Sequence, residues 1–239
     1  MKSERMNQKL SQATKRLFKC LKKSTTTEEI MKLIEVGADV NAKGKEGDTP
    51  LIMCFELSNG PDIIRLLIKA GANVNEKDDH GQTPLFAATV SQNPAILRVL
   101  IESGANVNEK DNLEFIPLTH AAAWNRNTDI LRVLIEAGGS INNIDAFGET
   151  PLTHAADTND NPEILRTLIN AGADVNVRAN TGFTALMYAA SKNKPDAVSI
   201  LIEAGAVFTE DDFKAVSSRY KKFKKFDNIL GEGKKYCKL

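Results

Sequence analysis

The chain has 239 residues, 42% hydrophobic and 26% charged, a balance that is ordinary for a soluble globular protein with a sizeable core. The formal net charge is zero but unevenly spread: residues 1–25 carry eight basic residues against one acid, residues 209–239 nine against five, and residues 26–208 fourteen against twenty-five. An acidic body excludes the usual nucleic-acid reader, which needs a basic binding surface. It fits a partner with a basic or mixed face, or a surface whose acids simply keep it soluble.

The three cysteines and the first residues bear on the compartment. Cys20, Cys54 and Cys237 are odd in number and widely spaced, which argues against a disulfide framework and a zinc knuckle. Residues 1–12 hold charges but no apolar signal-peptide core, and no run approaches the ~20 apolar residues of a membrane span. We expect a cytoplasmic protein, with export by a route that needs no cleavable signal as the alternative.

Two helices are predicted at the start of the chain. Leu17 and Leu21 lie at helical spacing in the first of them. Thr26, with Glu29 three places on, predicts a capping box at the start of the second. This pair is the first unit of a pattern that the following residues repeat.

Two markers then return at a fixed interval. A Gly-Ala-x-Val-Asn segment recurs in steps of 33 or 34 residues, beginning at Gly37, Gly71, Gly104, Gly138, Gly172 and Gly205; the copies at Gly138 (Gly-Gly-Ser-Ile-Asn) and Gly205 are degraded. A Thr-Pro-Leu marker keeps the same phase, beginning at Thr49, Thr83, Ile116, Thr150 and Thr184. Two phased markers over five periods indicate an internal structural repeat.

Each period predicts two helices. Thr of Thr-Pro-Leu caps the first helix and Pro suits its first position. The second helix opens at a second proline or at a threonine, in chain order Pro61, Pro94, Thr128, Pro162 and Pro195. An acid follows in most copies, where the helix N-terminus favours negative charge, and the repeated glycine ends the helix. The polar stretch before the next Thr-Pro is too short for a helix and predicts a projecting turn or hairpin.

These residues resemble the ankyrin repeat, whose period is 33 residues with a T-P-L-H-x-A motif. The resemblance covers residues 12–213 and implies an all-α ankyrin-repeat solenoid of stacked helix-turn-helix units with projecting β-turns or hairpins. The His of the family motif is replaced by Ile52, Phe86, Thr119, Thr153 and Met187. The hydrogen bonds of that His therefore do not carry over, whereas the fold does.

The predicted organisation has five full repeats between capping units that shield the end cores. Its segments are a flexible N-terminus (1–11), an N-terminal capping unit (12–43), repeats (44–208), a C-terminal capping helix (209–230) and a flexible basic tail (231–239). Thr209 and Asp212 are placed to open the last helix, whose apolar positions are Phe213, Val216, Tyr220 and Phe223.

The sequence predicts neither an enzyme nor a metal or cofactor protein. The common hydrolase, zinc and nucleotide-binding motifs are absent, and 31 residues after Phe208 are too few for a second domain. His120 and His154 occupy equivalent positions in neighbouring repeats, too far apart to share one zinc ion. No Cys, Asp or Glu at that repeat position completes a ligand set, so we expect each His to hydrogen-bond within the layer of first helices.

The resemblance implies binding of a partner protein through a concave face built by the hairpin tips and the exposed side of the first helices. Carried over by position, the partner-binding residues are Asp79, His80, Val90, Leu113, Phe115, Trp124, Phe147, Glu149, Asp157, Phe183 and Lys192. The phenylalanines have two interpretations, partner contact or packing between neighbouring hairpins, and their recurrence favours packing.

The third repeat departs most from the others. Glu114 replaces the turn glycine and Ile116 replaces the capping threonine, beside the only tryptophan, Trp124. Apolar residues at a normally polar tip, with acids nearby, predict a site for a partner that offers an apolar group beside Lys or Arg.

We therefore expect a monomeric interaction scaffold that binds another protein, takes no small-molecule substrate and catalyses nothing. One alternative is a regulator, inhibitor or exported effector of a partner enzyme. A second alternative is a tether to membrane or nucleic acid through the basic segment 219–225, where a packed terminal cap is the competing interpretation.

Overall fold

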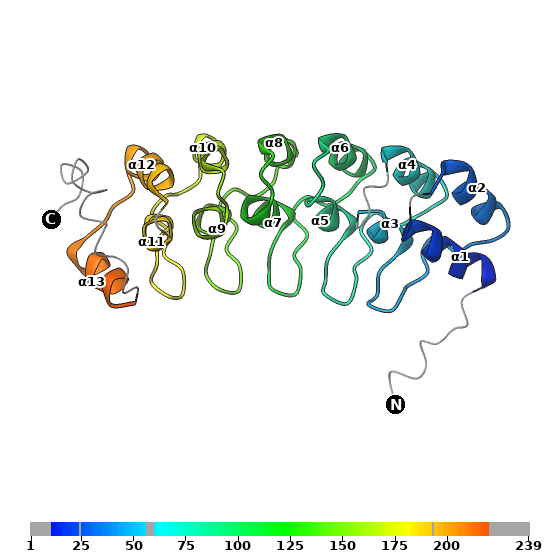
Figure 1. The fold of residues 1–239 in the computed structure, drawn as a ribbon, viewed down its shortest axis with the longest axis horizontal. Coiled ribbons are helices and arrows are strands. Elements are labelled where there is room, and N and C mark those ends of the chain that lie inside the picture. Colours follow the sequence, from blue (N-terminus) through cyan, green and yellow to red (C-terminus); the bar gives the residue numbers. More distant parts are fainter. Residues whose placement is uncertain (1–10, 24, 56–59, 193, 220–239) are drawn as a thin grey trace, which may run out of the picture. The chain divides into compact units, whose positions relative to one another are not determined.

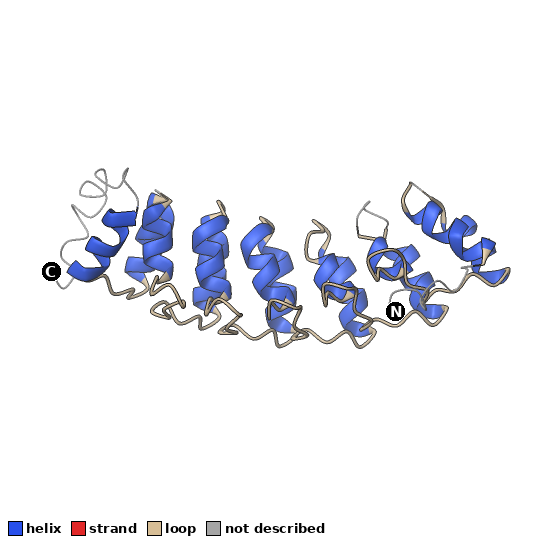
Figure 2. Ribbon diagram, turned by 90° about the horizontal axis from the view of Figure 1, so that it is seen from below, coloured by secondary structure: helices blue, strands red, loops and turns tan. Residues whose placement is uncertain are grey.

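The computed structural model describes residues 11–219 apart from 24, 56–59 and 193, and in the last helix it leaves out the side chains of 213 and 217–219. The described residues form helices, turns and loops without a strand (Figure 2). Most of the predicted N-terminal segment, the predicted helix beyond 219 and the tail 231–239 lie outside the described residues. The chain divides into two compact units, Met1–Asn112 and Leu113–Leu239.

The described residues of the first unit form six helices that pack in two rows (Figure 1). One row contains the first helix of each pair, α1 (Gln12–Leu21), α3 (Pro50–Met53) and α5 (Pro84–Ala88). The other contains α2 (Thr27–Glu35), α4 (Pro61–Lys69) and α6 (Pro94–Glu102). Each helix packs against its pair and against its neighbours in the same row.

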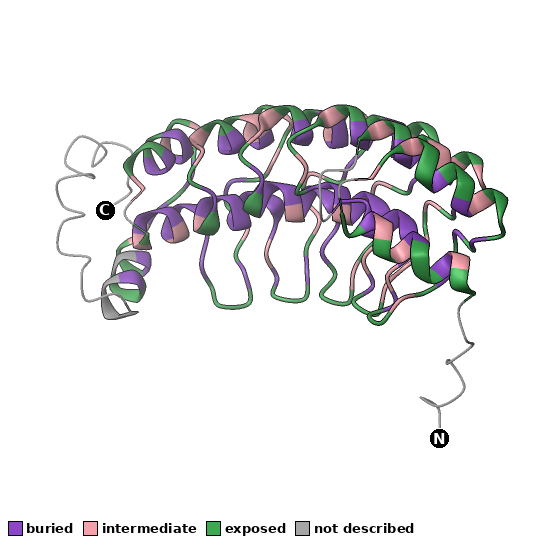
Figure 3. Cartoon of the chain, turned by 45° about the vertical axis from the view of Figure 1, so that its right-hand side comes forward, coloured by how far each residue is buried: buried purple, intermediate pink, exposed green. Residues whose placement is uncertain are grey.

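The second unit repeats this arrangement. Its first helices are α7 (Pro117–Trp124), α9 (Pro151–Thr158) and α11 (Ala185–Ser191), and its second helices are α8 (Thr128–Glu136), α10 (Pro162–Asn170) and α12 (Pro195–Glu203). A last helix, α13 (Glu210–Arg219), packs against α11. Within each pair the buried residues gather on the sides that face the neighbouring helices, while the loop tips are exposed (Figure 3).

The helix starts follow the predicted chemistry. Thr49, Thr83, Thr150 and Thr184 each accept a hydrogen bond from the backbone N–H three residues on, so they satisfy a donor that the helix itself leaves unpaired. The predicted capping box of Thr26 and Glu29 is also present. The sequence pattern places the starts of three second helices at Pro94, Thr128 and Pro162 but does not show what caps them. The capping residues are Asn93, Asn127 and Asn161.

The Gly-Ala-x-Val-Asn marker has a structural explanation at both of its ends. The glycines that follow the second helices have positive φ, for example 88° at Gly37 and 93° at Gly172, a conformation that Gly adopts without a steric penalty. The asparagine bridges to the next copy of the marker. Asn142 donates Nδ2–H to the carbonyl oxygen of Gly172 at 3.2 Å and accepts from the N–H of Asp174 at 2.9 Å. Because this pair of bonds also occurs at Asn41, Asn75 and Asn176, the marker holds neighbouring repeats together.

The start of the last helix is confirmed. Thr209 accepts from the N–H of Asp212, and the Asp212 carboxylate accepts from the N–H of Thr209. Arg178 donates to the same carboxylate at 2.9 and 3.3 Å. Val216 is fully buried, so α13 covers part of the core of the last pair; Tyr220 and Phe223, the other half of the predicted apolar face, lie outside the described residues.

Candidate functional site

The residues that precede the first helices alternate between outside and inside. Three residues before the cap the side chain is exposed, as at Leu113 and Phe147. One residue before the cap the side chain points inward, as at Phe115, Glu149 and Phe183. Between the two positions lies a residue with positive φ, which is Glu114, Gly148 or Gly182. The chain turns there, so the two side chains do not share a face as residues i and i+2 do in an extended chain. This turn gives each copy one exposed and one inward position. It separates Phe147 from the other two phenylalanines, so the three do not occupy equivalent positions although their recurrence in the sequence suggests that they do.

Phe115 is the centre of an aromatic cluster in the second unit. It is only 7% exposed, and its ring centroid lies 6.2 Å from that of Trp124 and 6.3 Å from that of Phe147. The ring of His154 is edge-on to it at 4.8 Å. These are distances at which aromatic rings attract one another. Phe115 therefore has little surface left for a partner, and its ring instead supports those of Trp124 and Phe147.

Three large apolar side chains around Phe115 remain open to solvent. Trp124 is 53% exposed, Leu113 49% and Phe147 48%. The loops that carry Leu113 and Phe147 are joined, because the N–H of Ala146 donates to the carbonyl oxygen of Leu113 at 3.2 Å. We call Leu113, Trp124 and Phe147 the aromatic patch.

Phe183, the third predicted phenylalanine, is 3% exposed. Its ring lies 5.3 Å from that of Tyr188 on α11. Of the two interpretations of the phenylalanines, burial favours packing for Phe115 and Phe183 and leaves partner contact open only for Phe147.

The predicted acids of the site are already engaged. Glu149 accepts a hydrogen bond from the hydroxyl of Tyr188, and its side chain is 15% exposed. Burial, together with this bond to Glu149, raises the pKa of Tyr188 to about 12. Asp157 forms an ion pair with Lys192 at 3.1 Å. These acids are therefore not open contact groups, and their effect on a partner is the longer-range one of net charge.

The predicted residues Asp79, His80 and Val90 belong to the first unit. All three are exposed. Asp79 and His80 sit on the turn before α5, and Val90 follows the end of that helix. Their exposure allows partner contact, and the aromatic patch is defined without them.

His120 belongs to the aromatic part of the site. Its ring lies 4.6 Å from that of Trp124 on the same helix, α7. Burial lowers the pKa of His120 to about 4, so it is neutral at physiological pH. The neutral ring of His120 packs against Trp124, so it supports that side chain of the aromatic patch.

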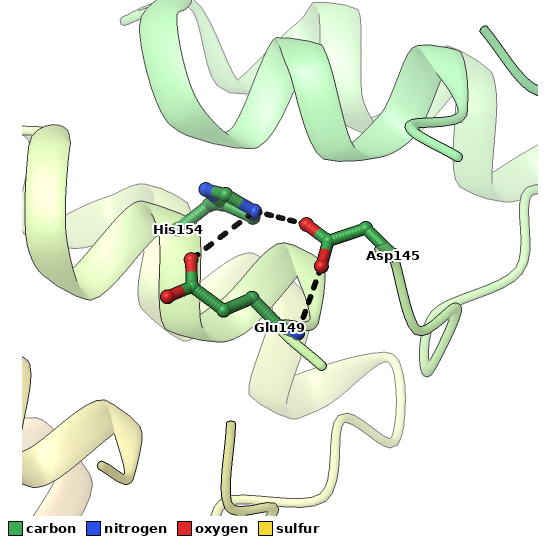
Figure 4. A group of neighbouring side chains, drawn as sticks. All are labelled: Asp145, Glu149 and His154. Carbon is green, nitrogen blue, oxygen red and sulfur yellow. Dashed lines mark hydrogen bonds and ion pairs between the residues drawn. The ribbon is translucent and has the colours of Figure 1, made fainter. Parts of the chain in front are cut away.

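His154, at the equivalent position of α9, has different neighbours (Figure 4). Its Nε2 lies 2.6 Å from Asp145 Oδ2 and 3.3 Å from Glu149 Oε2. Both carboxylates come from the loop before α9, so the expectation that each His bonds within the layer of first helices is wrong for His154. A comparison of equivalent repeat positions alone overlooks these carboxylates, which lie five and nine residues earlier in the chain.

The turn of the third repeat has a strained residue. Glu114 is at φ 63°, the only positive φ of a non-glycine residue in the described part of the chain. In the fourth repeat the same position is Gly148, where an added Cβ would lie 2.5 Å from Asn180 Oδ1. One period before Asn180 is Ala146, whose short side chain removes that obstacle. The exchange of Gly for Glu is thus matched by an exchange of Asn for Ala in the adjoining loop.

Comparison with known families identifies the class of protein that these repeats define. The family model described as "Ankyrin repeats (3 copies)" matches residues 17–111 and again 118–212. The chain therefore belongs to the ankyrin-repeat family, and the predicted all-α fold class is confirmed. Ankyrin repeats generally serve as protein–protein interaction modules.

Two further findings are negative. No curated protein matches the chain. Within the described residues, none of the helices is both long and apolar enough to pass through a membrane.

Proposed function

We propose that this chain is a noncatalytic interaction module that binds a partner protein through the aromatic patch of its second unit. The observation that carries the proposal is the half-exposed state of Trp124 and Phe147 against one buried ring, with half-exposed Leu113 two residues before that ring in the chain. Trp and other aromatic side chains that rest on a packed base are the residues that contribute most to protein interfaces.

The patch has the features of an anchor site rather than of scattered surface residues. Trp124 is held on a helix end and by contact with Phe115 and His120, so little side-chain entropy is lost when it is covered by a partner. Leu113 and Phe147 lie on two loops linked by a backbone hydrogen bond. The three side chains therefore offer a preformed apolar surface.

Charge indicates what surrounds the partner's apolar group. Residues 113–212 hold six basic and fourteen acidic residues, a net charge of −8. Such a charge attracts a basic segment over a longer range than direct contact does. The proposed partner segment carries an aromatic or aliphatic anchor with Lys or Arg nearby, and its association is expected to weaken as salt rises.

A display experiment tests the proposal and needs no identified partner. A random peptide library is selected on the wild-type protein after depletion on the Trp124→Ala variant. We expect enriched peptides with a large apolar residue near Lys or Arg. Val207 is a matched control, because it is 48% exposed and follows α12, the second helix of its pair. Depletion on Val207→Ala should remove these peptides along with all other binders, because that variant keeps the patch. The proposal is refuted if selection after depletion on Trp124→Ala recovers no more peptides than selection after depletion on Val207→Ala.

A further inference from the structure

We propose that Asp145, Glu149 and His154 form a binding site for a divalent transition-metal cation, with Zn²⁺ as the representative ion. One donor atom from each side chain lies within 4.8 Å of the other two. The proposal is independent of the aromatic patch, since it depends only on these three side chains and their supports.

The donor atoms are the ones that such a cation prefers. Zn²⁺ binds imidazole nitrogen and carboxylate oxygen at about 2.0–2.2 Å, which in tetrahedral geometry places two ligand atoms roughly 3.3 Å apart. His154 Nε2 and Glu149 Oε2 are already 3.3 Å apart. Nε2 and Asp145 Oδ2 are 2.6 Å apart, so this pair must open by less than an ångström. Water or a donor from another molecule would complete the coordination.

The two carboxylates are oriented by their other oxygens. Asp145 Oδ1 accepts from the N–H groups of Phe147 and Glu149 at 2.8 and 2.9 Å. Glu149 Oε1 accepts from the Tyr188 hydroxyl. Asp145 Oδ2 and Glu149 Oε2 are thereby left to face the imidazole (Figure 4). Hydrogen-bonded carboxylates of this kind are typical of metal ligands, whose outer contacts fix their direction.

Burial makes a compensating charge favourable. The side chains of Asp145, His154 and Glu149 are 0%, 10% and 15% exposed. One Nε2–H can satisfy only one of the two carboxylates by a linear hydrogen bond, and two carboxylates at low exposure repel each other. A divalent cation balances both charges, and the partial exposure of Glu149 and His154 leaves it a way in. The nitrogen ligand favours Zn²⁺ over Mg²⁺, which prefers oxygen.

The chain contains its own control for this site. Its three histidines are His80, His120 and His154, and only His154 is in the cluster. In the preceding repeat Phe115 occupies the position of Glu149, so the same helix position there lacks the glutamate. A His80→Asn, His120→Asn double variant therefore keeps every proposed ligand, whereas His154→Asn removes one and keeps the other two histidines.

Isothermal titration with Zn²⁺ on the full chain tests the site, in a background with Cys20→Ser and Cys237→Ser so that these two thiols do not compete. We expect one equivalent to bind to the background protein and to the double histidine variant with the same affinity. His154→Asn and Glu149→Gln should each bind at least about tenfold more weakly, and Mg²⁺ in excess should not compete. Circular dichroism checks that both variants fold, and Glu149→Gln serves where His154→Asn does not.

Two results would overturn the proposal. One is the absence of Zn²⁺ binding to the background protein, which would make the cluster a hydrogen-bonded group only. The other is an unchanged affinity in the folded His154→Asn and Glu149→Gln variants, which would place the ion elsewhere on the chain.

Discussion

The third and fourth repeats share the helix sequence Pro-Leu-Thr-His-Ala-Ala, at residues 117–122 and 151–156, yet their histidines lie in different surroundings. The ring of His120 packs at a tilt against Trp124 and is kept neutral by burial, whereas His154 faces two carboxylates. The difference comes from two positions: the inward position before the cap is Phe115 in one repeat and Glu149 in the other, and the helix ends on Trp124 in one and on Thr158 in the other. The shared six residues thus acquire different chemistry from the residues on either side of them.

The two loops also make the same turn with different residues. Glu114 adopts a positive φ beside Ala146, and Gly148 adopts one beside Asn180. The two pairs are alternative solutions for the same turn, one with a side chain on the turn and one with a side chain on its neighbour. The comparison can be tested by exchanging their parts.

The largest effect is expected from Gly148→Glu, which gives the fourth repeat the turn residue of the third. The new Cβ would lie 2.5 Å from Asn180 Oδ1 at a backbone φ of 74°. The left-handed conformation and the forced shift together should lower the free energy of unfolding by about 3 kcal/mol, measured by urea denaturation.

The reverse exchange, Glu114→Gly, is its control. It relieves a left-handed side chain and should leave the protein at least as stable as wild type. A loss of less than about 1 kcal/mol for Gly148→Glu would contradict the account of the two turns.

A smaller effect is expected from the histidine of the third repeat on acidification. Burial lowers the pKa of His120 to about 4 from 6.5, so between these values the unfolded chain takes up a proton that the folded chain refuses. The free energy of unfolding should therefore fall as pH drops through this window, by on the order of 2 kcal/mol from this residue alone. Urea denaturation at pH 7 and at about pH 4.5, inside this window, should show a smaller loss for His120→Asn than for wild type.

His80→Asn is the matched control, because His80 is exposed. It controls for the exchange of a histidine for asparagine at a position outside α7. If His120→Asn and wild type lose the same free energy of unfolding on acidification, burial of His120 does not have the effect described for it.

The sequence was sufficient for the helices but not for the site, and the reason is the range of the interactions. Thr150 caps the helix that begins at Pro151, and Gly172 follows the helix that ends two residues before it. Both residues therefore act on their immediate neighbours in the chain. The interaction of Glu149 with Tyr188 spans 39 residues and depends on how one repeat docks on the next. The position of each phenylalanine relative to its cap, by contrast, is readable in the sequence and distinguishes Phe147 from Phe115.

Two further residues show where sequence patterns mislead. Thr119 follows the pattern of Thr153, but Ile116 replaces the threonine with which Thr153 forms a capping box. The hydroxyl of Thr119 is the one buried side-chain polar atom without a hydrogen-bond partner in the described residues. Leu113, in turn, occupies a tip that is polar in the first unit, and the local pattern gives no packing reason for it.

The proposed binding surface arises from the departures of the third repeat together with Phe147 of the fourth. The most direct test is the affinity of a peptide selected on wild type for the Trp124→Ala and Val207→Ala variants, measured beside their free energies of unfolding. We predict a loss of at least about 30-fold for Trp124→Ala, the effect of removing an interface anchor, with less than about 1 kcal/mol lost in stability and no change for Val207→Ala. Equal affinity for all three proteins, or a loss of binding only in proportion to a loss of folding, would contradict it.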